Sequence, residues 1–158
     1  MSNADIQPSS IYLETLLSYY EDEIRGEAYF YAQVEHFSEP EKVILLARIE
    51  RRAAEAIKPL IEKYGLIPRD ESIIKREGQS YLDRHKSYSW PEFMAYMVKR
   101  YPGYVDEFLA LERIAPVADL PALNRLTNHE VAVIDFAQKE IAGDPGSMTP
   151  LLQYLGDL

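Results

Sequence analysis

Two glutamates interrupt the apolar stripes of neighbouring helical segments, and the same arrangement occurs again later in the chain. Glu27 and Glu50 are 23 residues apart, and Glu107 and Glu130 have the same separation 80 residues further on. Burying one ionised carboxylate costs several kcal/mol, and four carboxylates close together repel one another. Divalent cations would cancel this charge, and oxygen ligands suit iron, manganese, magnesium or calcium. The spacing therefore predicts a metal site made of these four glutamates.

Two other residues are alternative ligands at the same site. Glu112 competes with Glu107, because it follows another apolar face of the same helical segment. His129 directly precedes Glu130. It therefore lies about 100° further round a helix and would bind the same ion only with an offset geometry. The 23-residue repeat favours Glu107 and Glu130.

Two tyrosines and an acidic run surround Glu27 in the sequence. Tyr20 and Tyr31 are candidates for groups that donate hydrogen bonds or carry a radical next to the metal. The alternative is an ordinary core position in which the hydroxyl group finds a partner. Residues 21–23, which read Glu-Asp-Glu, are typical of a solvated helix face. We therefore expect the two tyrosines near the site and the acidic run in solvent.

Helices are the elements that would carry these residues. Apolar residues recur at steps of three and four, and no alternation typical of strands is sustained, so the fold class is all-α. Pro59 is expected to kink one helix, Gly65 to end it, and Pro102-Gly103 to open another. The pattern predicts long helices at 10–37, 40–64, 104–115 and 120–142, and shorter ones at 71–82, 91–100 and 151–155.

These helices are expected to form a single domain over residues 1–158, a length that fits one ordinary domain. Each of two helical hairpins carries one of the four glutamates on each arm, and their apolar positions match at an offset of 80 residues. A long, partly helical crossover joins the hairpins. The predicted parts are a hairpin at 10–65, the crossover at 66–103, a hairpin at 104–143 and a tail at 144–158.

The arrangement resembles the ferritin-like superfamily, on its rubrerythrin-related side. The segments EIRGEAYFYAQVEHF and NHEVAVIDFAQKEI are similar to the first and fourth helices of that family. The resemblance implies a four-helix bundle with two divalent metal ions, iron or alternatively manganese, bridged by carboxylates. It also implies oxygen or peroxide chemistry, or iron oxidation. Glu27 and Glu107 would then be terminal ligands, and Glu50 and Glu130 bridging ligands.

The chain departs from that family at two positions. The family's second and fourth helices carry Glu-x-x-His, but the third residues here are Ala53 and Val133. A site without these histidines would bind metal more weakly, and the absence of a Cys-x-x-Cys appendage means that electrons would come from a separate protein. Two functions stay open: a dinuclear metal oxidoreductase, or a metal-free degenerate bundle that acts as a binding or interaction module. In the second, the glutamates would be neutralised by protons or by one of four arginines, Arg25, Arg51, Arg113 or Arg125.

The composition excludes several other classes of protein. There is no cysteine, which excludes disulfide scaffolds and thiolate metal sites. The net charge of −9 argues against nucleic acid and anionic membranes as partners. The longest apolar run, 43–47, is far shorter than the ~20 residues of a membrane helix, and residues 1–10 lack a signal-peptide pattern. We therefore expect a cytoplasmic protein.

The aromatic-rich segment around residues 91–101 suggests self-association. Phe93, Tyr96, Met97 and Tyr101 cluster on one short predicted helix of the crossover. Apolar and aromatic side chains of this kind are enriched at protein interfaces. The sequence therefore predicts a homodimer.

Overall fold

Local capping signals set where the helices begin. In the computed structural model, which describes residues 7–158, all regular secondary structure is helical, as predicted. The Ser9 hydroxyl accepts a hydrogen bond from the Tyr12 amide at the start of the first helix, and Ser89 and Glu92 form a capping box before the fifth. The elements are α1 (Ser10–Ala32), α2 (Pro40–Lys63), α3 (Glu71–Ser80), α4 (Leu82–His85), α5 (Trp90–Ile114), η2 (Val117–Asp119), α6 (Leu120–Ile141) and α7 (Thr149–Leu155).

The end of α2 follows the prediction, whereas the end of α1 and the start of α5 do not. Gly65 has a φ of 62° just beyond α2, in the left-handed region that glycine adopts without strain. α1 ends at Ala32, earlier than the predicted boundary at 37. The predicted helices 91–100 and 104–115 are one helix, α5, which continues through Pro102.

Packing explains why Pro102 does not end α5. Proline removes one backbone hydrogen bond and favours a helix break. The buried face of α5 nevertheless continues on both sides of it, with Met97 and Tyr101 before the proline and Phe108 and Leu111 after it. Burial of this face outweighs the lost hydrogen bond. The second hairpin therefore begins at Trp90, and the crossover predicted to reach residue 103 ends before it.

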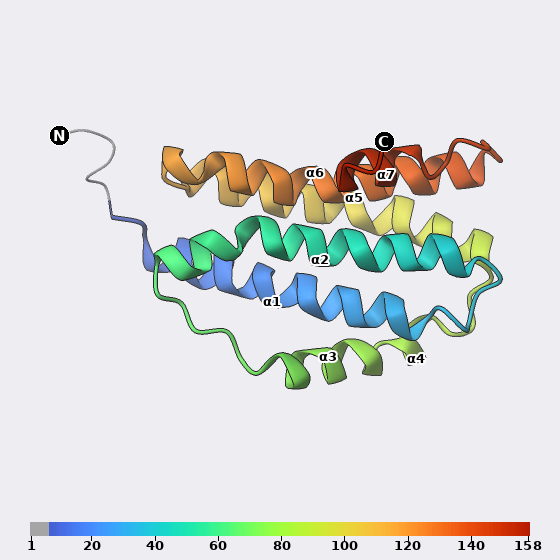
Figure 1. Cartoon of the computed structure of the whole chain (residues 1–158), viewed down its shortest axis with the longest axis horizontal. Helices are drawn as coiled ribbons and strands as arrows, with labels where there is room; N and C mark the ends of the chain where they lie inside the picture. The colour runs from blue at the N-terminus through green and yellow to red at the C-terminus, as the bar shows by residue number, and fades with distance from the viewer. Residues whose placement is uncertain (1–6) are drawn as a thin grey trace.

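The long helices lie side by side in two antiparallel hairpins (Figure 1). α1 packs against α2, α5 packs against α6, and contacts between α2 and α6 and between α1 and α5 join the pairs. The chain between α2 and α5 returns along the length of the molecule, so α2 and α5 run in the same direction. On this return path α3 packs against α1. After α6, the short helix α7 contacts both α2 and α6.

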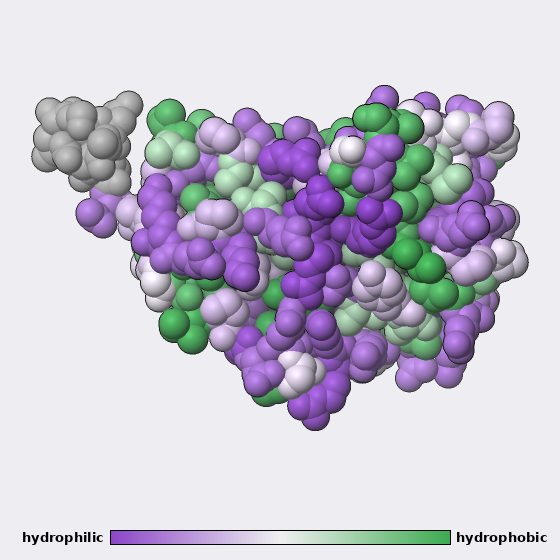
Figure 2. All heavy atoms as spheres, viewed as in Figure 1, coloured by the Kyte–Doolittle hydropathy of each residue, from purple (hydrophilic) through white to green (hydrophobic). Residues whose placement is uncertain are grey.

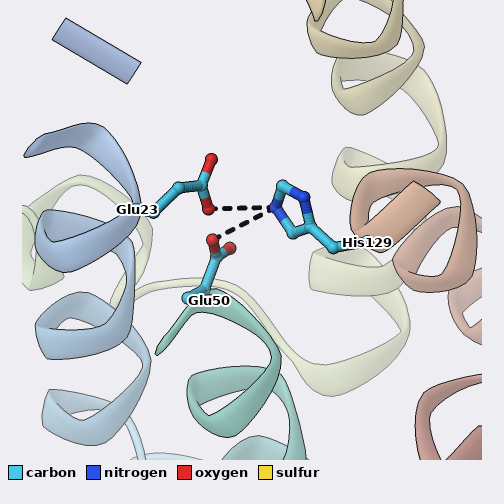
Figure 3. Close-up of side chains that lie close together, drawn as sticks. All are labelled: Glu23, Glu50 and His129. Atoms are coloured by element: carbon cyan, nitrogen blue, oxygen red, sulfur yellow. Dashed lines mark ion pairs between the residues drawn. The ribbon is translucent and has the colours of Figure 1, made fainter. Parts of the chain in front are cut away.

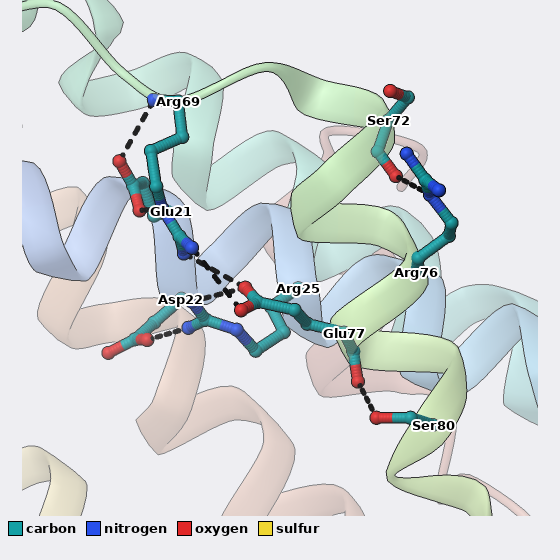
Figure 4. A network of polar contacts seen from close by, with 8 residues as sticks. All are labelled: Glu21, Asp22, Arg25, Arg69, Ser72, Arg76, Glu77 and Ser80. Atoms are coloured by element: carbon teal, nitrogen blue, oxygen red, sulfur yellow. Dashed lines mark hydrogen bonds and ion pairs between the residues drawn. The ribbon is translucent and has the colours of Figure 1, made fainter.

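Ion pairs hold α3 and the residues before it against α1 (Figure 4), and a glycine of α3 lies at the contact. Arg69 Nε donates to Glu21 at 2.8 Å, while Glu77 of α3 pairs with Arg69 at 2.9 Å and with Arg25 of α1 at 3.1 Å. A Cβ atom at Gly78 would overlap the backbone carbonyl oxygen of Arg25. The glycine therefore allows α3 to approach α1 closely, and the crossover forms a fixed cover over α1.

The surface shown in Figure 2 carries a strongly hydrophilic band across its middle, over the central turns of α2. Three arginines of α2, Arg48, Arg51 and Arg52, pair with acidic side chains, and Arg52 also donates to a backbone carbonyl oxygen. In residues 7–158, no helix is long and apolar enough to cross a membrane. Residues 1–6, part of the segment examined for a signal peptide, lie outside the described residues.

The aromatic residues behind the homodimer prediction belong mostly to the interior of this chain. Phe93 and Met97 are 0% exposed, and Tyr101 is 7% exposed. All three pack in the same hydrophobic cluster, with Tyr96 partly buried against it. Phe93, Met97 and Tyr101 therefore stabilise the fold of the single chain, and the homodimer stays a prediction.

Candidate metal centre

A polar layer divides the apolar core of the long helices into two clusters. On α2, the buried apolar residues from 43 to 49 belong to one cluster and those from 53 to 61 to the other. The other long helices change cluster at the same level, so the polar residues found there lie near the middle of the molecule. The buried polar side chains at this level include Glu23 from α1, Glu50 from α2, and His129 and Glu130 from α6.

Three of these side chains converge from three different helices (Figure 3). His129 Nε2 lies 3.0 Å from Glu23 Oε2 and 3.4 Å from Glu50 Oε2. One possible ligand atom from each of the three lies within 4.8 Å of the others. Glu130 Oε2 is 3.6 Å from the same nitrogen, and the imidazole ring is fully buried. Glu23, Glu50 and His129 thus converge on a common centre, and Glu130 lies beside it.

Several atoms of this group lack hydrogen-bond partners. Among the described residues, Glu130 Oε1 is buried and makes no hydrogen bond, while Glu23 Oε2 and His129 Nε2 are buried with no partner outside this group, 3.0 Å from each other. His129 Nδ1 donates to the backbone carbonyl oxygen of Leu126. In the neutral ring this bond leaves the lone pair on Nε2, toward the carboxyl groups. Because buried polar atoms without partners are costly, the arrangement fits an additional cation at its centre.

Burial and mutual repulsion shift the proton affinities of these groups. Burial, and then the charge of Glu23, raises the pKa of Glu50 well above its usual range. Burial raises the pKa of Glu130 to about 8, although His129 opposes this shift. Burial alone lowers the pKa of His129, but the surrounding carboxylates outweigh it and raise that pKa well above its ordinary value. Without a metal ion, the site therefore retains protons at neutral pH.

A cavity of about 320 Å³ lies beside this group, between α1 and α5. Glu23, Glu50 and Glu130 line it, together with several tyrosines of the two helices. Arg84, from α4, also lines the cavity and is exposed. The cavity therefore has both an exposed lining residue, Arg84, and the buried carboxyl groups in its wall.

Glu27, one of the four glutamates predicted from the repeat, is directed to a different partner. Its carboxylate accepts two hydrogen bonds from Arg51 of α2, both at 2.8 Å. Arg51 also pairs with Glu71 at the start of α3. The structure therefore neutralises Glu27 with an arginine and does not bring it to Glu50.

The remaining candidates also lie away from the common centre. Glu107 is exposed and lines the cavity, and Glu112 accepts a hydrogen bond from Thr127 at 3.1 Å. Tyr31 is 47% exposed, whereas Tyr20 is buried. Neither tyrosine is among the described residues that line the cavity. The structure thus brings together Glu50, Glu130 and His129, and it separates them from the other predicted residues.

Sequence reasoning missed Glu23, because residues 21–23 were expected to be solvated. Glu21 and Glu23 are 8% and 4% exposed, so this expectation was wrong for both. A usable signal was present in the sequence. Tyr12, Leu16, Glu23 and Phe30 recur at steps of four, seven and seven, and all four are buried. This spacing places Glu23 on the inward face of α1.

Known proteins add no assignment to this geometry. Comparison with protein families, with curated proteins and with solved structures finds no match for the chain. The arrangement of Glu23, Glu50, His129 and Glu130 is therefore the basis on which a function is proposed.

Proposed function

We propose that this chain is a ferritin-like four-helix bundle that binds a divalent metal ion, iron or manganese, at Glu23, Glu50 and His129. Glu130 would be the fourth ligand. The observation that carries the proposal is the convergence of three possible ligand atoms within 4.8 Å of one another, from three helices, in the buried layer of the bundle.

The donor set supports this choice of metal. Carboxylate oxygens suit hard cations, and imidazole suits iron and other transition metals, so the mixed set favours iron or manganese over calcium. The hydrogen bond from His129 Nδ1 to the Leu126 carbonyl is a common support for a ligating histidine. A cation at the centre would also coordinate Glu23 Oε2 and His129 Nε2, which are buried and have no partner outside the group.

One ion fits the described residues better than the two suggested by the family resemblance. Glu27 is already paired with Arg51, and Glu107 is exposed on α5. Within residues 7–158, a single group of three or more possible ligands lies close enough to hold an ion. The proposal is therefore a mononuclear site.

We propose an oxidoreductase role for the metal-loaded protein. Bound iron would supply oxygen or peroxide chemistry, and electrons would come from a separate protein. The chain itself provides a cavity that reaches Glu50 and Glu130. Buried apolar residues on both sides of the polar layer limit the access of water from the ends of the bundle.

A metal-free binding module is the second candidate, and one observation favours it. The raised pKa values of Glu50 and Glu130 allow protons to neutralise the site, just as Arg51 neutralises Glu27. In that case the cavity would be a ligand-binding pocket and the polar layer a structural feature. Substituting Glu50 would then leave stability unchanged or raise it.

Metal analysis of matched glutamine variants separates the two candidates. The purified protein would be treated with chelator, loaded with iron(II) without oxygen or with manganese(II), and desalted before elemental analysis. We expect about one metal ion per chain in the wild type and in Glu27→Gln, because Glu27 contacts Arg51. We expect close to none in Glu23→Gln and in His129→Gln.

Thermal unfolding supplies an independent measurement on the same samples. A ligand that binds only the folded state stabilises it, by about 2.7 kcal/mol at a concentration 100 times its Kd. The wild type should therefore melt at a higher temperature with manganese(II) than with chelator, and Glu23→Gln should not. No metal in the wild type after loading, with no change in melting, would overturn the metal proposal and favour the binding module.

A further inference from the structure

The cavity beside the candidate metal centre is lined by aromatic rings that metal binding does not require. Eight of its 17 lining residues are tyrosine or phenylalanine, most of them from α1 and α5. The rings of Tyr96 and Tyr101 are 6.3 Å apart and inclined at 77°, and those of Tyr101 and Tyr104 are 5.3 Å apart and inclined at 59°. Aromatic groups pack well edge to face and in offset stacks, so these walls suit a planar aromatic ligand.

Two exposed arginines at this cavity have N–H groups without an acceptor. The guanidinium group of Arg84 lies over the Tyr81 ring at 4.1 Å, and that of Arg100 lies over the Tyr104 ring at 4.2 Å. In the described part of the chain, neither side chain forms an ion pair or a hydrogen bond. Stacking uses the flat face of a guanidinium group and leaves its in-plane donors free. Both arginines are therefore positioned by a ring and able to bind an anion.

These two arginines lie near the same wall residue, Tyr96. Arg84 lines the cavity directly, and the charges of Arg84 and Arg100 both oppose the rise that burial causes in the pKa of Tyr96. The His85 ring lies 4.4 Å from the Tyr96 ring, and the Tyr29 hydroxyl donates to His85 Nδ1 at 2.5 Å. These contacts hold α4, and Arg84 with it, at the edge of the cavity.

The acidic lining residues leave these two arginines unneutralised. Five lining residues are acidic, and two of them already form ion pairs, one with Arg25 and one with His129. Burial raises the pKa of Glu50 and Glu130, so these two retain protons when no metal is bound. The fifth, Glu107, is exposed on α5. Among the described residues, the unpaired cations at the cavity therefore outnumber the unpaired carboxylates.

We infer that this cavity binds a small aromatic carboxylate, with its carboxylate group held by Arg84 and Arg100 and its ring enclosed by tyrosine side chains. Arginine binds carboxylates through two parallel N–H donors, which makes it well suited to this group. The volume of about 320 Å³ is at the lower end of the ~300–1,000 Å³ common for ligand pockets, so the ligand is small.

This inference goes beyond the proposed metal site and is tested without metal. Naphthoate would be titrated into chelator-treated protein in a calorimeter, in parallel with its uncharged amide. The two molecules have nearly the same shape, so the difference between them measures the charge. We expect naphthoate to bind at least about tenfold more tightly than the amide, because only the carboxylate gains charge-assisted hydrogen bonds from arginine.

An aliphatic acid tests the role of the aromatic walls. Octanoate carries the same charge as naphthoate on a flexible chain without a ring. It should bind at least about threefold more weakly than naphthoate, because it gains no ring-to-ring packing and loses more conformational freedom.

Four variants locate the binding site. Arg84→Gln and Arg100→Gln should each weaken naphthoate binding about fivefold and leave binding of the amide unchanged. Arg113→Gln is the matched control, because Arg113 is also exposed on α5 but does not line the cavity, and it should bind naphthoate as the wild type does. Glu107→Gln removes a negative charge from the cavity lining, so naphthoate binding should stay the same or become tighter.

Several outcomes would overturn the inference. They are undetectable naphthoate binding, equal binding of naphthoate and its amide, equal binding of octanoate, or unchanged binding in both Arg84→Gln and Arg100→Gln. The substituted arginines are exposed, so these variants test the site without disturbing the core. Metal content is measured on separate samples, so binding of the acid and binding of metal succeed or fail independently.

Discussion

Gly26 of α1 lies directly against the carboxyl group of Glu50 on α2. A Cβ atom at Gly26 would be 3.1 Å from Glu50 Cδ, and 3.2 and 3.3 Å from its two oxygens. These contacts are tighter than ordinary van der Waals distances. The absence of a side chain at Gly26 therefore gives the Glu50 carboxyl group its position in the polar layer.

Gly26→Ala should weaken metal binding without weakening the fold. The added methyl group would displace the Glu50 carboxyl group by a few tenths of an ångström, and changes next to a ligand commonly cost about tenfold or more in metal affinity. Alanine also favours a helix over glycine by about 0.5–1 kcal/mol, so the metal-free variant should unfold at the same temperature or higher. Manganese(II) titration and thermal unfolding measure the two effects.

Gly103→Ala is the matched control for this variant. Gly103 also lies inside a long helix, but a Cβ atom there would meet only Arg100 Nη1, at 3.0 Å, which is the end of a flexible side chain. This variant should keep the metal affinity of the wild type. Equal affinity in Gly26→Ala and Gly103→Ala would show that Gly26 does not position a metal ligand.

The sequence was sufficient to predict the helices but not every boundary. Periodicity identified the long segments, and Gly65 correctly marked the end of α2. Pro102-Gly103 was misleading, because local preference favoured a break while the buried face from Met97 to Phe108 favoured a continuous helix. Whether a helix breaks or continues at such a position depends on how distant helices pack against it, and local sequence signals do not contain this packing.

The candidate site was predictable only in part, for a geometric reason. Residues four apart on a helix differ by about 40° in direction and by about 6 Å along the axis. Glu23 and Glu27 are separated in this way, so both interrupt the apolar pattern of α1. The partner helices decide between them, because Arg51 of α2 pairs with Glu27, while His129 of α6 faces Glu23. A spacing repeat in the sequence has no information about these partners.

Arg51 should matter for stability and not for metal binding. Its two hydrogen bonds to Glu27 compensate a carboxylate that is 8% exposed. Arg51→Met would leave that carboxylate without its partner, and we expect a loss of about 1–3 kcal/mol in the free energy of unfolding, allowing for the partial exposure of Arg51. Denaturant unfolding of the metal-free protein measures this loss.

A second substitution at the same pair provides the control. In the double variant Glu27→Gln, Arg51→Met no charge is left without a partner, so most of the lost stability should return. Both variants should bind as much metal as the wild type. Metal loss in Arg51→Met with unchanged stability would instead place Glu27 in the metal site.

Asp119 joins three helices at the end of the molecule opposite the α1–α2 turn. It is 0% exposed and accepts hydrogen bonds from Tyr12 of α1 at 2.7 Å, from Tyr64 at 2.5 Å and from Lys63 of α2 at 2.8 Å. Burial alone raises the pKa of Asp119, but the three donors outweigh burial and hold it below its ordinary value of 3.8. The ionised form is therefore stabilised by folding.

Asp119→Asn should reduce stability in a manner that depends on pH. Because the pKa of Asp119 is lower in the folded than in the unfolded protein, its contribution is fully present above pH 3.8 and decreases as the pH falls toward the folded-state pKa. We expect the variant to be about 2–3 kcal/mol less stable than the wild type near neutral pH, in line with hydrogen bonds to charged groups. The difference should narrow in strongly acidic solution, where both side chains are neutral. Asp106→Asn, at an exposed position, is the control and should show no such difference in stability. If the difference in unfolding free energy between Asp119→Asn and the wild type stays constant with pH, the Asp119 charge does not stabilise the fold.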